Sequence, residues 1–143
     1  MLFSRINRSN PEKIFMTVYN DYGTAAITVG MPVIWDYAGT ADGVSVTKPT
    51  AESGIAAAGV VADASIASGS YGLIQVWGYN ADAIVDGGTD VAAGDGITMN
   101  AAAFELYMCS TASTAVLDVP CGFAYAAITA ATAAATAVHL KCL

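Results

Sequence analysis

The chain has 143 residues, a length that suits one globular domain or two small halves packed together. Charged residues make up only 12% of the chain, hydrophobic residues make up 55%, and the formal net charge is −7 at pH 7. Alanine and valine rather than leucine supply much of the apolar share, which argues against a membrane span, and the acidic balance argues against nucleic acid as a partner. So few charges predict a surface that is largely covered by other protein.

Residues 1–13 carry three of the five cations and a single carboxylate. The rest of the chain has two lysines against eleven carboxylates, a formal charge of −9. A basic segment on an acidic body is suited to docking on an acidic surface, and the proline near its end favours an extended backbone. We therefore predict an extended N-terminal arm in which Leu2, Phe3, Arg5 and Arg8 bind a partner. The alternative is a frayed chain end.

Short strands separated by turn signals are predicted after this arm. Apolar or alternating runs occupy residues 14–19, 31–36, 44–48, 58–62 and 72–79. Asp-Gly dipeptides at 42–43, 86–87 and 95–96 favour tight turns, because both residue types accept a positive φ. This density of turns predicts an all-β fold, a small barrel or sandwich of short strands over residues 14–143.

A faint internal repeat relates residues 27–79 to residues 90–142. Residues 27–36 align with 91–100 at an offset of 64, residues 58–62 with 121–125 at 63, and residues 73–77 with 137–141 at 64. Three blocks in one order at nearly constant spacing predict that the β domain consists of two similar halves. The alignment also indicates the secondary structure of the alanine-rich stretch 124–137. Its counterpart contains a glycine and three serines, so we expect strand, loop and strand there rather than a helix.

The alignment assigns faces in the closing strand of each half, because side chains alternate across a strand. Ile74 and Val76 match Val138 and Leu140, all apolar, and are predicted to point inward. Gln75 and Trp77 match His139 and Lys141 and are predicted to point outward. Trp77 and Tyr79 would then form an exposed aromatic pair, of the kind enriched where proteins bind one another. The alternative is that Trp77 covers the end of a small core.

The candidate reactive residues show no spacing typical of a catalytic, metal or cofactor site. Cys109, Cys121 and Cys142 lack metal-ligand spacing and are interpreted as thiols of a protein made in a reducing cytoplasm. His139 is the single histidine, and neither a nucleophile elbow nor a phosphate-binding loop is present. The aspartates of residues 82–95 resemble a solvated turn region more than a calcium loop, which would need regular ligand spacing. We therefore predict a protein that is not an enzyme, with no catalytic residue, metal or cofactor.

Three short strings together resemble one known class of protein. They are Ala-Ala-Gly-Val-Val-Ala at 57–62, Gly-Leu-Ile-Gln-Val-Trp-Gly at 72–78 and Asp-Val-Ala-Ala-Gly-Asp at 90–95. In these patterns and in its low charge the chain is similar to head decoration, or cement, proteins of tailed bacteriophages. The resemblance implies an all-β homotrimer, made in the host bacterial cytoplasm, that binds the major capsid protein on the outer surface of the virion and has no nucleic acid or membrane partner.

Two other classes of protein share parts of this pattern. A different virion or cell-surface module, such as a tail, fibre or adhesin part, would have the same composition but no capsid-binding arm. A small ligand-binding β-barrel would need an apolar pocket with convergent polar groups, which a core filled by alanine disfavours.

Overall fold

A computed structural model describes residues 12–50, 56–62, 64–88, 90–100, 103–109, 119–129 and 132–143. These residues form nine β-strands and no α-helix, so the prediction of an all-β fold is confirmed. The strands are β1 (Lys13–Asn20), β2 (Pro32–Trp35), β3 (Ser45–Thr47), β4 (Ala57–Val61), β5 (Tyr71–Val85), β6 (Gly96–Met99), β7 (Leu106–Met108), β8 (Gly122–Ala124) and β9 (Ala134–Lys141). β8 and β9 lie where a strand, a loop and a strand were expected in place of an alanine-rich helix.

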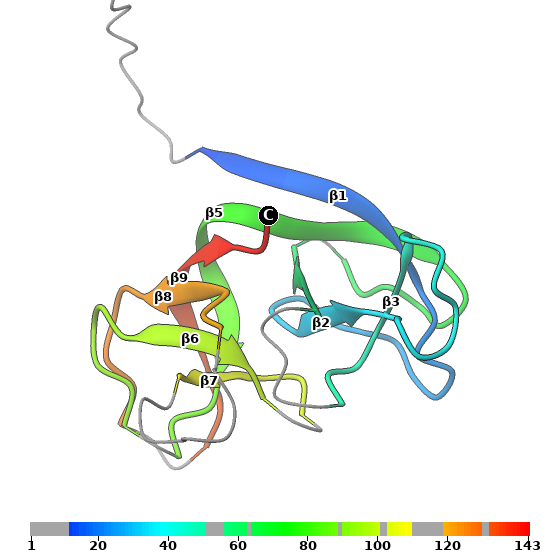
Figure 1. Cartoon of the computed structure of the whole chain (residues 1–143). Helices are drawn as coiled ribbons and strands as arrows, with labels where there is room; N and C mark the ends of the chain where they lie inside the picture. The colour runs from blue at the N-terminus through cyan, green and yellow to red at the C-terminus, as the bar shows by residue number, and fades with distance from the viewer. Residues whose placement is uncertain are drawn as a thin grey trace, which may run out of the picture.

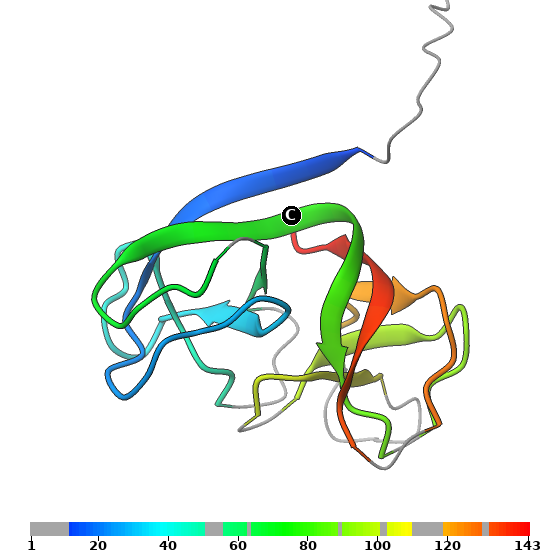
Figure 2. The ribbon, with the colours of Figure 1, turned by 180° about the vertical axis from the view of Figure 1, so that it is seen from behind.

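The nine strands of the described residues are hydrogen-bonded in the order β1-β3-β2-β4-β5-β7-β6-β8-β9, with additional pairings β1–β5 and β5–β9. The additional pairings close two rings of strands. The first ring is β1-β3-β2-β4-β5 and the second is β5-β7-β6-β8-β9. The long strand β5 belongs to both, since it runs beside β1 and then turns down beside β9 (Figures 1 and 2).

The two rings have the same order and sense of pairing. Each contains one parallel pair, β1–β3 in the first and β5–β7 in the second, and the other pairs are antiparallel. Val33 pairs with Gly59 in the first ring, and Ile97 pairs with Gly122 in the second. These four residues occupy matching positions of the sequence repeat.

Each ring encloses its own cluster of buried apolar side chains. Six aligned pairs have one member in each cluster: Ile27 and Val91, Val33 and Ile97, Ala58 and Cys121, Val61 and Ala124, Ile74 and Val138, and Val76 and Leu140. The inward orientation predicted for the last two pairs is confirmed, because all four side chains are fully buried. Burial of these side chains is the main force that holds each ring closed.

The outer side of the first ring is packed against the second ring. Ile34 of β2 and Ala57 and Val60 of β4 belong to the buried cluster of the second ring rather than to that of their own. Phe104, just before β7, packs on Tyr22 with the ring centroids 5.2 Å apart. The two rings therefore form one continuous packed body.

The prediction that Gln75 points outward to the surface is wrong, because its side chain is only 1% exposed. Its Nε2 donates to the carbonyl oxygens of Trp77 and Tyr79 at 3.1 and 3.0 Å, and its Oε1 accepts from Asn80 Nδ2 at 3.2 Å. These bonds form where β5 passes from one ring to the other. Both sides of the strand are covered there. The alternation of side chains along the strand therefore does not predict which of them are exposed.

Candidate functional site: an aromatic face

Five ring side chains of the described residues lie next to one another on the outer side of the second ring. They are Trp77 and Tyr79 of β5, Phe123 of β8, His139 of β9 and Tyr125, which directly follows β8, and together they are called the aromatic face here. The register explains the gathering. His139 is paired with Tyr79 on one side and with Phe123 on the other, and paired residues project to the same side of a sheet.

The rings contact one another in favourable geometries. Phe123 and His139 are stacked, with centroids 5.1 Å apart and planes 10° from parallel. Trp77 meets His139 edge to face at 5.7 Å, and Tyr125 meets Phe123 edge to face at 5.1 Å. Such pairs stabilise by about 0.5–1.5 kcal/mol beyond the area they bury. The face is therefore a preorganised surface rather than a set of independent side chains.

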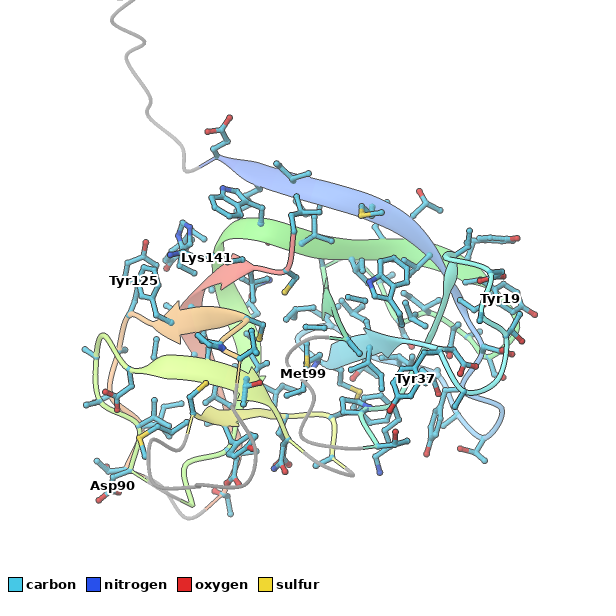
Figure 3. All side chains as sticks on the ribbon, in the orientation of Figure 1. Tyr19, Tyr37, Asp90, Met99, Tyr125 and Lys141 are labelled. Carbon is cyan, nitrogen blue, oxygen red and sulfur yellow. The ribbon has the colours of Figure 1, made fainter. Side chains whose placement is uncertain are left out.

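Polar and cationic groups lie at the edges of the aromatic face. The Tyr125 hydroxyl lies 3.2 Å from His139 Nδ1, a hydrogen bond whose donor depends on the imidazole tautomer. Lys141 Nζ lies 5.4 Å from the centroid of Phe123, and Lys13 Nζ lies 6.0 Å from that of Tyr79. Figure 3 shows Tyr125 and Lys141 close together at the outer edge of β8 and β9. Two of the three lysines of this acidic protein thus lie at the edge of the aromatic face.

Exposed apolar side chains extend the aromatic face onto β1. Ile14 is 43% exposed and Phe15 is 47% exposed. Ile14 is paired with Trp77, which in turn is paired with Lys141, so the surface is continuous across β1, β5 and β9. A contiguous apolar surface of this kind is typical of a protein–protein contact site.

The structure places two of the predicted partner-binding residues in this face. Trp77 and Tyr79 are both half-buried rather than fully exposed, and Trp77 also packs against the core of the first ring. Leu2, Phe3, Arg5 and Arg8 lie outside the described residues. Sequence reasoning missed Phe123 and Tyr125. The available signal was their spacing of two residues, which puts two aromatic side chains on one side of a strand.

The interpretation of residues 82–95 as a turn region is wrong at its start, because Asp82 lies within β5, but the hydrogen bonds of Asp86 and Asp95 agree with it. Asp86 accepts a hydrogen bond from the backbone of Gly88, and Asp95 accepts one from the backbone of Ala92, both at 2.8 Å. In the described parts of the chain, no three histidine, cysteine, aspartate or glutamate side chains come together as a metal-binding group. No helix among those residues is long and apolar enough to cross a membrane.

Two thiols meet where the last strand ends. Cys121 is buried in the core of the second ring, and Cys142 Sγ lies 3.7 Å from its carbonyl oxygen. A hydrogen bond between the two thiols raises the pKa of Cys121, which burial raises further. The same bond lowers the pKa of Cys142, because it stabilises the Cys142 thiolate.

We therefore expect Cys142 to be alkylated faster than Cys121 by iodoacetamide at mildly alkaline pH, since the thiolate is the nucleophile. Peptide mass spectrometry after timed labelling measures both rates, and Cys109→Ser removes the third thiol as a complication. The Cys121→Ala variant should slow labelling of Cys142, because it removes the hydrogen bond that stabilises the Cys142 thiolate. Equal rates for the two thiols in the folded protein would contradict this assignment.

Comparison with models of known protein families gives no match, and no curated protein sequence matches the chain. The fold and the aromatic face therefore carry the functional argument. They define an all-β protein that presents a preformed aromatic surface with a cationic edge.

Proposed function

We propose that this chain is a virion structural protein that binds the outer surface of a tailed-bacteriophage capsid and stabilises the shell as a decoration protein. The observation that carries the proposal is the aromatic face on a chain with so few charged residues. Tyrosine and tryptophan anchors typically contribute ~2 kcal/mol or more each when a partner covers them. A surface of this kind is suited to assembly rather than to the transformation of a small molecule.

The repeated pairing pattern supports a finer description of the fold. We infer that the chain is a duplicated unit, in which each ring of strands is a small β-barrel and β5 closes one barrel and opens the next. In this arrangement the position of β5 in the second ring corresponds to the position of β1 in the first ring. Two packed barrels give a rigid platform, which suits a protein whose role is mechanical.

The N-terminal arm is proposed as the segment that attaches to the major capsid protein. Its support is the sequence alone: Leu2 and Phe3 gain from leaving water, and Arg5 and Arg8 can pair with partner carboxylates. Exposed ion pairs are worth only ~0–1 kcal/mol each, so the apolar pair should matter as much as the charge. The arm precedes β1, whose exposed apolar side lies beside the aromatic face.

Cosedimentation with expanded, DNA-free capsid shells of the phage that encodes the chain tests the proposal. The full chain is expected to pellet with the shells, and a variant lacking residues 2–10 is expected to fold and to remain in the supernatant. A matched variant, Tyr37→Ala, changes an exposed aromatic in the loop after β2 and should still pellet. Failure of the full chain to bind shells would overturn the capsid assignment. Binding to isolated tails instead would favour the alternative of a tail or fibre module.

A further inference from the structure

The two rings differ in what covers one matching pair of residues. Val60 pairs with Gln75 in the first ring, and Phe123 pairs with His139 in the second. The two pairs correspond in the sequence repeat at offsets of 63 and 64. Val60 and Gln75 are fully buried, whereas Phe123 and His139 are only half-buried. The same position on the two rings is therefore closed in one case and open in the other.

The cover over the first pair comes from the same molecule. Val60 lies in the buried cluster of the second ring together with Ile34 and Ala57, so the second ring packs over this side of the first. The corresponding side of the second ring carries the aromatic face, and Tyr125 there is 47% exposed. Within the chain, the second ring thus covers this side of the first ring. The corresponding side of the second ring is left open.

We propose that the aromatic face is covered by a second copy of this chain, in a head-to-tail contact that repeats between molecules the packing of the two rings within one. This inference rests on the proposed function, which requires assembly, and it names the partner of the aromatic face. Charge supports the same occupant. The chain outside residues 1–13 has a formal charge of −9, and Lys13 and Lys141 at the edge of the face would meet that acidic surface.

The geometry of the contact restricts the oligomeric state. A head-to-tail contact joins two different surfaces, so each molecule uses one surface to bind the copy before it and the other to bind the copy after it. The contact closes in a ring of copies or continues as a filament. In a trimeric ring, six strand rings would surround one axis.

Sedimentation velocity on the Tyr125→Glu variant tests the contact. Tyr125 follows β8 and is exposed, so the substitution should leave the fold intact, which far-ultraviolet circular dichroism checks. A carboxylate in the contact should weaken self-association at least tenfold. The matched control is Tyr37→Glu, which adds the same charge at a tyrosine that is 55% exposed on the first ring, in the loop after β2. The control should assemble like the unchanged protein.

Two outcomes would overturn the inference: an unchanged protein that stays monomeric at high micromolar concentration, or a Tyr125→Glu variant that assembles normally. Capsid cosedimentation of the same variants separates this inference from the proposed function. If Tyr125→Glu assembles but no longer binds shells, the face contacts the capsid and the self-contact is wrong. If the unchanged protein forms the closed ring but does not bind shells, the capsid assignment fails and the self-contact stands.

Discussion

Replacing Gly78 with alanine is expected to lower the free energy of unfolding by about 3 kcal/mol or more. Gly78 has a φ of +93°, and β1 passes so close to it that an added methyl group would overlap the backbone oxygen of Glu12. The left-handed conformation alone costs a residue with a Cβ about 1–2 kcal/mol. The overlap with a backbone atom adds roughly 1–3 kcal/mol, because no flexible side chain can move aside.

Gly94 offers a matched control for this substitution. Its φ is +94°, but a Cβ built on it meets no atom within 4 Å. Gly94→Ala should therefore cost only the conformational strain, about 1–2 kcal/mol. Urea denaturation of both variants isolates the close approach of β1 to β5, since the two glycines have nearly the same φ. Equal losses of stability would show that β1 can move away from Gly78 without cost.

Gln75→Glu is expected to destabilise the protein by about 3 kcal/mol or more at neutral pH, because it leaves a buried charge without a cationic partner. The Gln75 amide donates to two backbone oxygens of its own strand, and an ionised carboxylate cannot donate at all. The Asn80 amide, which now donates to Gln75 Oε1, would remain the carboxylate's hydrogen-bond donor.

The destabilisation by Gln75→Glu should depend on pH with a definite sign. Burial raises the pKa of the new carboxyl in the folded state above its unfolded value of about 4.3. Below that value the group is protonated in both states, so the ionisation penalty is absent. Above it the penalty grows by about 1.4 kcal/mol per pH unit until the folded pKa is reached. Urea titrations at several pH values measure this slope relative to the unchanged protein.

His139→Glu is the control, because His139 aligns with Gln75 but is half-buried and lies two residues before Lys141 on the same strand. The variant loses the ring contacts of His139 with Trp77, Phe123 and Tyr125, each worth about 0.5–1.5 kcal/mol, and should lack the rising penalty with pH. A flat pH profile for Gln75→Glu as well would mean that water reaches position 75.

Local patterns predicted the features that depend on short stretches of chain. Alternation and aspartate-glycine turns indicated the all-β fold, and the glycine and serines of the aligned segment indicated that residues 124–137 are not a helix. The alignment also oriented Ile74, Val76, Val138 and Leu140 correctly. These features follow from backbone preferences and from the period of two along a strand, which a sequence shows directly.

Which side chains are exposed at the junction of the rings could be determined only from the tertiary structure. Gln75 and His139 occupy matching positions, yet one is buried and the other lies in the aromatic face. The difference arises because the second ring packs over the first, and that packing joins residues distant in the chain. Phe123 and Tyr125 likewise become neighbours of Trp77 and Tyr79 only when β9 pairs with both β5 and β8. Composition and alternation determined that this chain forms short strands with apolar inner sides, but which outer sides remain open was decided by how one ring covers the other.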